Sequence, residues 1–314
     1  ALRRALHALR INDGLLSEAQ LPLLRALADS YQAIGDYESA QRTLRYGFRV
    51  HGMGRGQLTP AALQDALAYF RRAREIFIDP RAPQDIGLFF EAYEDNRAMY
   101  EAQVGAGAAD ARPAWPARKA IALSHLRNLY LVLGTNLDRY QSGAGDTGRS
   151  GMEFMQRSQL LTFSRGRKLL EGLLADPEAP PGERARLLLR LGNWLQWNDK
   201  RQSGCETLEA AWAADAEGGS VRQQLHNPAE LPEDVDLWRS LRASDLPTRV
   251  LVRVSFDVSA RGHIRSIDGE QVGDEGGGAG RVLRWLRDSH ARPAVRAGKC
   301  VDARLEGRVY RLVD

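Results

Sequence analysis

From residue 1 to about residue 215, apolar residues recur at the three- and four-residue spacing of an amphipathic helix. Glycine, proline and aspartate interrupt this pattern about every 12 to 20 residues, which predicts separate helices rather than one long helix. No stretch in this region alternates apolar and polar residues as a half-buried strand does. The predicted helices are 1–10, 21–35, 37–50, 60–78, 86–103, 117–141, 152–175, 183–197 and 202–214, with loops at 105–116, 142–151 and 176–183.

Composition limits the class of protein. A hydrophobic fraction of 43% suffices for a folded core, and a mean hydropathy of −0.41 without a long apolar run predicts no transmembrane segment. The net charge is only +4, although residues 281–314 are locally basic. Neither a helix-turn-helix pattern nor aromatic residues between the basic ones accompany that stretch, so we expect no nucleic-acid partner.

After residue 215 the chain changes character. Residues 218–248 are interrupted by glycine and proline and are predicted to be a connector. Residues 250–258, VLVRVSFDV, then alternate cleanly, with Val252, Val254, Phe256 and Val258 expected on the buried face. A turn at 260–262 leads into a second strand at 263–272, an amphipathic helix follows within 276–290, and a long strand is predicted at 299–313. The expected order is β-β-α-β in an antiparallel sheet.

Two short stretches carry the spacing of a known helical repeat. The first consists of Leu27, Ala28, Tyr31, Gly35, Tyr37, Ala40 and Leu44, and the second of Gly192, Leu195, Gly204, Leu208 and Ala211. Small residues sit where two helices would cross closely, and Gly35 and residues 197–200 would form the turns between them. These offsets resemble those of the tetratricopeptide repeat, a helix-turn-helix unit of 34 residues. The resemblance implies an α-solenoid of helical hairpins, which is one extended array rather than a compact bundle.

The C-terminal region resembles the C-terminal domain of TonB-type energy transducers. The matching residues are Val254, Phe256, Val258, Gly262, Ile264, Arg292, Pro293, Ala294, Gly298 and Val301, whereas Ala291 stands where that family carries an aromatic residue. We therefore expect a mostly α protein, with a tetratricopeptide-like α-solenoid over residues 1–217, a connector over 218–248 and a TonB-like α+β domain over 249–314. Because the proline-rich spacer and the membrane anchor of the transducers are not found, we expect the module to serve binding.

Motifs for catalysis or cofactor binding are weak. Gly143, Gly145 and Gly148 have the spacing of a dinucleotide-binding loop, but the preceding segment is helical rather than a strand. Ser150 lies on a predicted loop between helices, which is not the strand-to-helix turn of a nucleophile elbow. The six histidines are dispersed, so a metal site would depend on the fold alone. We predict a non-enzymatic protein without cofactor or metal.

The repeat resemblance implies where a partner protein would bind. In tetratricopeptide proteins, positions 2, 5, 9, 12 and 13 of the first helix of a repeat face the concave groove. Carried over to this chain, they give Arg25, Asp29 and Gln32 in the first repeat and Arg186, Asn193, Gln196 and Trp197 in the last. The alternative is that degenerate repeats pack their groove against other parts of the same chain.

The two cysteines, Cys205 and Cys300, match no zinc or redox spacing. They are either two separately buried thiols or one long-range disulfide, which would form if the C-terminal domain docks on the end of the helical array. The TonB-like domain implies an envelope protein, so we expect the periplasm of a Gram-negative bacterium, with the cytoplasm as the alternative.

Taken together, the sequence predicts a protein-binding or scaffolding subunit of an envelope assembly. Two alternatives stay open. One is a TonB-like transport component that pairs with an outer-membrane receptor by strand addition, and the other is an enzyme subunit with a site between the domains.

Overall fold

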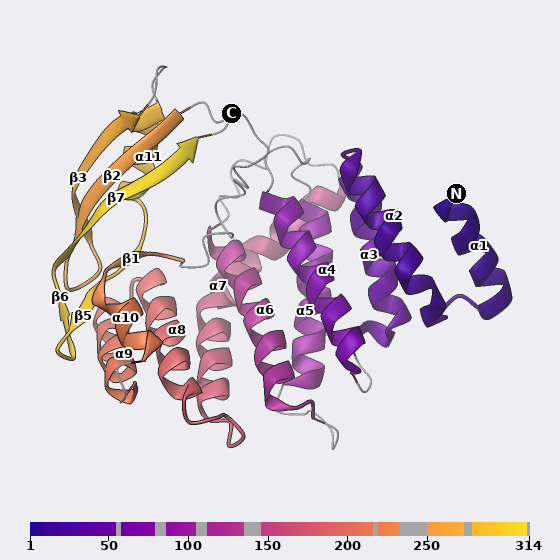
Figure 1. The fold of residues 1–314 in the computed structure, drawn as a ribbon, viewed down its shortest axis with the longest axis horizontal. Coiled ribbons are helices and arrows are strands. Elements are labelled where there is room, and N and C mark those ends of the chain that lie inside the picture. The colour runs from indigo at the N-terminus through magenta and orange to yellow at the C-terminus, as the bar shows by residue number, and fades with distance from the viewer. Residues whose placement is uncertain are drawn as a thin grey trace. The chain divides into compact units, whose positions relative to one another are not determined.

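The computed structural model describes residues 1–54, 58–78, 86–104, 112–134, 146–215, 219–232, 250–272 and 278–312. The protein is mostly helical, with a small antiparallel sheet region near the C-terminus (Figure 1). The chain forms two compact units, Ala1–Thr162 and Phe163–Asp314, which we call unit 1 and unit 2 and describe separately. Within the described residues, no helix combines the length and the apolar character needed to cross a bilayer.

Unit 1 consists of helices that follow one another along the chain. They are α1 (Leu2–Asp13), α2 (Leu21–Ala33), α3 (Tyr37–Val50), α4 (Pro60–Ile78), α5 (Ile86–Gln103), α6 (Trp115–Gly134) and the first part of α7 (Asp146–Leu174), with short 3-10 turns at Glu18–Gln20 and Gly52–Gly54. The helices predicted at 37–50, 60–78 and 86–103 are confirmed to the residue. The predicted end of the sixth helix, 135–141, lies outside the described residues.

The α2–α3 hairpin shows why the sequence breaks at Gly35. This glycine has a φ of 78°, a left-handed conformation that favours glycine, and the next amide, Asp36 N–H, donates back to Tyr31 O at 2.9 Å. The Asp36 carboxylate then accepts from Ser39 N at 3.1 Å, which caps the first turn of α3. Ala28 and Ala40 are buried, as expected of small residues at a close helix crossing.

The core of unit 1 is built by contacts between successive helices, from α2 with α3 to α5 with α6, and by a contact between α4 and α6. Its central cluster of buried side chains is Phe48, Ala66, Tyr69, Phe70, Ala73, Ala92, Met99 and Ile121. Because these residues come from α3, α4, α5 and α6, each helix buries an apolar face against at least one neighbour.

Unit 2 begins with the second part of α7 and continues with α8 (Glu183–Trp197), α9 (Arg201–Ala214) and α10 (Ser220–His226). Glycines let α8 and α9 approach closely, since a Cβ added at Gly192 would lie 2.6 Å from Leu208 Cδ2. Leu208 and Ala211 are fully buried at this crossing. The turn predicted at 197–200 is confirmed, with Asp199 in the left-handed region at a φ of 56°.

The sheet of unit 2 has the strand order β3-β2-β7, and all pairings are antiparallel (Figure 1). It comprises β2 (Val250–Val258), β3 (Ile264–Val272) and β7 (Ala303–Leu312), and α11 (Gly278–Arg287) packs on it. The predicted alternation of β2 is confirmed, because Val252, Val254, Phe256 and Val258 are all fully buried. The long strands and α11 follow in the predicted β-β-α-β order.

The prediction of one continuous strand at 299–313 is wrong. Residues Lys299–Val301 form β6, which pairs with β5 (Ala294–Arg296), while β7 pairs with β2. The break falls at Asp302, whose carboxylate accepts from Ala260 N at 2.6 Å. This side-chain contact ties the chain to the β2–β3 turn at the point where it changes strand partners.

Two predicted loops also need correction. Of the loop at 142–151, residues 142–145 lie outside the described residues, but α7 already begins at Asp146. An acidic residue is favourable at a helix start, and the cost of about 1 kcal/mol for an interior glycine such as Gly148 does not stop a 29-residue helix. Of the connector at 218–248, residue 218 and residues 233–248 lie outside the described residues, but 219–232 contain α10 and β1 (Ala229–Glu230), which pairs with β4 (Ala291–Arg292). Val221 and Leu225 are buried on one face of α10 and anchor it.

A glycine in α7 permits its contact with α8, and this makes a testable prediction. A Cβ added at Gly166 would lie 2.3 Å from Cζ2 of Trp194, a fully buried side chain whose Nε1–H donates to Phe163 O. We expect Gly166→Ala to lower the free energy of unfolding by about 2 kcal/mol through this overlap. Gly172, in the same helix, has open space around it, so Gly172→Ala should raise that free energy by up to about 1 kcal/mol. Urea unfolding of both variants tests the prediction, and equal effects would contradict it.

Candidate functional site

The three predicted groove residues of the first repeat share one face of α2. Arg25, Asp29 and Gln32 follow each other at helical spacing, whereas the adjacent residues Leu24 and Ala28 are buried. The side chains of Arg25 and Asp29 are 54% and 76% exposed. Gln32 is half-buried, and its Oε1 atom has no hydrogen-bond partner among the described residues.

Two residues of α4 complete this face. Asp65 Oδ2 lies 2.5 Å from Arg25 Nη2, and Arg72 Nη2 lies 3.7 Å from Asp29 Oδ1. We call the five residues Arg25, Asp29, Gln32, Asp65 and Arg72 the α2–α4 face. Charges of both signs alternate along it, and each ion pair joins one helix to the other. In each pair one side chain is exposed and the other is half-buried, and Arg72 also pairs with Glu75 at 3.0 Å. Ion pairs open to solvent on one side contribute about 1 kcal/mol or less to stability, so Arg25 and Asp29 can exchange partners at low cost.

A buried histidine supports one end of the α2–α4 face. The side chain of His51 is only 3% exposed, and its Nε2 lies 2.9 Å from Asp65 Oδ2. Its Nδ1 lies 3.7 Å from the exposed carboxylate of Glu18. Asp65 thus has a neighbour on either side, His51 and Arg25, which hold its carboxylate at the surface of α4.

Sequence reasoning missed Asp65 and Arg72. A signal was present, because the two residues are seven positions apart and so lie on one face of the α4 helix. The repeat offsets of α2, however, do not recur in α4, and the approach of the two helices depends on α3, which lies between them in sequence and contacts both.

The predicted groove residues of the last repeat behave differently. Asn193 and Gln196 are buried, at 6% and 1% exposure, and so they do not offer a surface to a partner. Gln196 Nε2 donates to Arg201 O at 3.2 Å, and a Cβ added at Gly262 would lie 2.8 Å from Gln196 Oε1. The β2–β3 turn therefore covers this part of α8. This contact corresponds to the alternative prediction, in which a degenerate repeat packs its groove against another part of the same chain.

The other two predicted groove residues of the last repeat, Arg186 and Trp197, have different surroundings. Arg186 is exposed and forms an ion pair with Glu183 at 3.1 Å. The ring of Trp197 is half-buried and lies 4.9 Å from the ring of His290. Burial lowers the pKa of His290, Asp199 opposes this effect and Arg201 adds to it. The neutral imidazole is therefore favoured beside Trp197.

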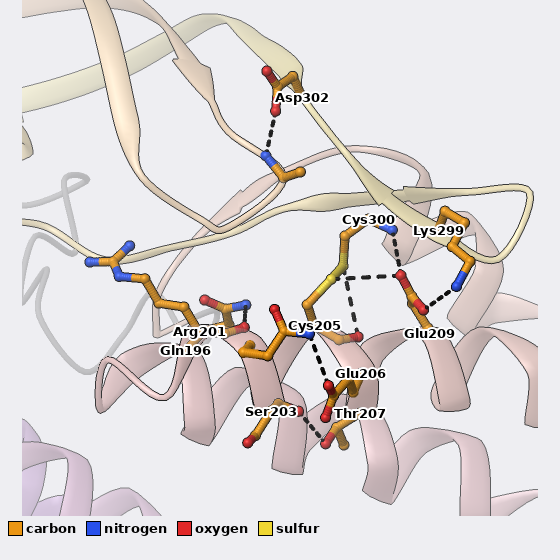
Figure 2. The surroundings of a disulfide bond; sticks show 12 residues. Gln196, Arg201, Ser203, Cys205, Glu206, Thr207, Glu209, Lys299, Cys300 and Asp302 are labelled. Atoms are coloured by element: carbon orange, nitrogen blue, oxygen red, sulfur yellow. Dashed lines mark hydrogen bonds and ion pairs between the residues drawn. A yellow bond between two sulfur atoms is a disulfide. The ribbon is translucent and has the colours of Figure 1, made fainter.

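Cys205 and Cys300 are joined by a disulfide, with their Cα atoms 6.1 Å apart (Figure 2). It links α9 to β6 within unit 2, so the structure has the bridge rather than two separate thiols. Glu209 braces the link, because its Oε1 accepts from Cys300 N at 3.1 Å and its Oε2 lies 3.0 Å from Lys299 Nζ. Burial alone would raise the pKa of Glu209, but the bonds from Lys299 and Cys300 N outweigh it and lower the pKa.

Cys205, Glu209 and Cys300 are the one candidate for a metal site within the described part of the chain. Ligand atoms of Cys205, Glu209 and Cys300 lie within 4.8 Å of one another. The two sulfur atoms are bonded to each other, however, and a metal ion needs free thiolates. The oxidised pair therefore does not fit a metal ion.

The remaining sequence motifs do not add a site that the structure describes. Gly143 and Gly145 lie outside the described residues. Gly148 and Ser150 belong to the first turns of α7, where the structure describes the backbone but not the side chains.

Comparisons with known proteins leave the family of the chain open. No protein-family model matches the sequence, and a search of curated proteins finds no relative.

Proposed function

We propose that this chain is a non-enzymatic protein-binding or scaffolding protein and that its α2–α4 face binds the partner. The observation that carries the proposal is the exposed pair Arg25 and Asp29, set across from Asp65 and Arg72 on the neighbouring helix. Two adjacent helices thus present charged side chains of both signs, and a partner with the complementary pattern would be selected by them.

Binding at the α2–α4 face needs no rearrangement of the core. The residues beneath it, such as Leu24 and Ala28, are already buried in unit 1. A charged partner side chain would replace one member of an existing exposed ion pair, and the displaced side chain would keep its contact with water. Specificity would come from the order of charges along α2 and α4, since a like charge at the wrong place is repelled.

The architecture in this proposal is a tetratricopeptide-like α-solenoid with a TonB-like module at the C-terminal end. Consecutive packing of α2 to α6 supports the first part, and the order of β2, β3, α11 and β7 supports the second. We place the protein in the periplasm of a Gram-negative bacterium. The Cys205–Cys300 bond supports that compartment, because disulfides persist where the environment is oxidising.

A second candidate function is transport coupling by strand addition to a receptor. It is favoured by the strand order β3-β2-β7, in which β3 and β7 are the outer strands of the sheet. An outer strand can pair with an extended segment of another protein. In that case the partner would protect backbone amides of β3 or β7 from hydrogen exchange. Our first proposal instead expects the partner to contact α2 and α4. The enzyme alternative stays a prediction from the sequence.

The proposal predicts the result of a charge swap. We expect the double variant Arg25→Glu/Asp29→Lys to lose at least about 90% of the partner recovered by affinity capture from the native host, because the reversed charges at both positions would repel the complementary charges of the partner. The net charge of the chain is unchanged by this swap. Its free energy of unfolding should fall by no more than about 1 kcal/mol, as for other exposed sites.

The matched control is the swap Arg167→Glu/Glu171→Arg. These two residues form an ion pair of similar exposure, 54% and 45%, on the part of α7 in unit 2. The control should recover the same partner as the unmodified chain, with partners identified by mass spectrometry. Equal recovery by both swapped variants would remove the α2–α4 face as the binding site.

A further inference from the structure

A second feature of the molecule lies wholly in unit 2 and includes no residue of the α2–α4 face. It is a cavity of about 460 Å³ between the α8–α9 turn and the β2–β3 turn, lined by Asp199, Lys200, Arg201, Gln202, Ser203, Arg261 and His263. The two turns are 60 residues apart in sequence, yet Arg201 Nη1 donates to Arg261 O at 3.5 Å. The cavity is thus formed by the fold rather than by one loop.

The lining of this cavity is strongly unbalanced in charge. Three cations, Lys200, Arg201 and Arg261, and a single carboxylate, Asp199, line it, which gives a net charge of +2 before His263 is counted. The Asp199 carboxylate already accepts from Arg201 Nη2 at 2.7 Å. It therefore neutralises Arg201 first and leaves the charges of the other two cations uncompensated by the lining.

Burial and the same excess of positive charge together lower the pKa of His263. Burial lowers the pKa of His263, and the neighbouring cations Arg201 and Arg265 lower it further. Arg261 adds to this effect, and Asp199 alone opposes it. A proton on His263 is disfavoured because the surroundings are already positive, and an anion in the cavity would reverse that effect.

Neutral donors lie beside the cations. The side chains of Gln202 and Ser203 line the cavity and carry N–H and O–H groups. Arg201, Gln202 and Ser203 are the first residues of α9, and Arg261 and His263 add lining groups from the β2–β3 turn. Cations together with neutral donors are the combination that phosphate and carboxylate groups require.

We propose that this cavity binds an oxyanion group, phosphate or carboxylate, of a small ligand. Arg261 and Lys200 would supply the attraction, since Arg201 is engaged by Asp199. Gln202 Nε2 already donates to Glu206 Oε1 at 2.9 Å, so Ser203 O–H and the second N–H of Gln202 would supply hydrogen bonds. His263 would gain a proton more easily with the site filled. The site is independent of the protein-binding face, because it lies in unit 2 and uses none of the same residues.

The test is an NMR titration of the isotope-labelled full chain with inorganic phosphate and, separately, with citrate. Ionic strength is held constant with sodium chloride, so that screening alone gives no change. We expect a saturable shift of the His263 imidazole signals and a higher pKa of His263 in the saturated protein. Saturation by phosphate alone identifies a phosphate-bearing ligand, by citrate alone a carboxylate-bearing ligand, and by both an oxyanion site of either source.

Two variants separate this site from general attraction to a basic protein. Arg261→Gln removes one lining cation and should weaken binding by about fivefold or more, as expected for loss of a charge-assisted contact. Arg253→Gln removes an equal charge from an exposed position on β2 that does not line the cavity, and it should change binding by less than about twofold. Lys200→Gln serves as a second lining variant if Arg261→Gln alters the fold. Absence of saturation with both anions, or equal losses in the lining and control variants, would overturn the proposal.

Discussion

Replacing Cys205 and Cys300 by serine together is expected to lower the free energy of unfolding by about 4 to 5 kcal/mol. The bond closes a loop across a sequence separation of 95 residues, and the chain-entropy model assigns this amount to the restriction of the unfolded chain. In the folded protein the bond fastens β6 to α9, so that its loss also removes the covalent link between these two elements. Urea unfolding of the oxidised protein and of the double variant measures the difference.

Two controls accompany this experiment. The unmodified protein, unfolded in a thiol reductant, should lose about as much stability as the serine variant, since both lack the same cross-link. Peptide mapping without reduction should recover the two cysteines in one linked pair. Alkylation of both thiols without prior reduction would show that the bond is absent and would contradict the prediction.

Asp95→Ala is expected to lower the free energy of unfolding by about 3 kcal/mol. Asp95 lies on α5 with its side chain only 7% exposed, and it accepts from Arg45 Nε at 2.9 Å and from Tyr69 OH at 3.1 Å. These partners belong to α3 and α4, so one carboxylate holds three helices together. Removing it leaves the buried Tyr69 hydroxyl without this acceptor and takes away one of the two carboxylates, Asp95 and Glu91, that pair with Arg45, which is costly.

The state of Tyr69 agrees with this role. Burial raises the pKa of Tyr69, and the nearby Asp95 carboxylate raises it further, against the opposing effect of Arg45. The phenol therefore stays protonated and donates to Asp95. As a matched control, Glu101→Ala on the same helix removes an exposed carboxylate whose partner Arg97 lies at 3.4 Å. That change should cost less than about 0.5 kcal/mol, and a loss as large as that of Asp95→Ala would contradict the account.

Much of the helical part could be predicted from the sequence because its boundaries are set locally. Asp36 caps α3 with its own side chain, and Pro60 begins α4 at a position where proline is tolerated. The strand β2 was predictable for a similar reason. Its apolar residues alternate with polar ones, and the apolar residues form the face that packs against α11. Arg25, Asp29 and Gln32 are grouped by the positions of the repeat resemblance, which follow the spacing of one helix face.

Other features depend on contacts between distant residues and could not be predicted locally. Asp302 divides the last strand because it binds Ala260 N, 42 residues away. Asn193 and Gln196 are polar and at groove positions, yet the β2–β3 turn at Gly262 covers the helix that carries them. The helix α10 is only seven residues long, too short for its two buried residues to form a recognisable period.

The most direct test of the protein-binding function is photo-crosslinking in the native host. A photoreactive amino acid is placed at Asp29, on the α2–α4 face, and in a second strain at Glu38, whose side chain is 54% exposed on α3. We predict a covalent adduct with one partner protein from position 29 and none from position 38. Absence of an adduct at position 29, or the same adduct at both positions, would contradict the assignment of the α2–α4 face as the partner-binding surface.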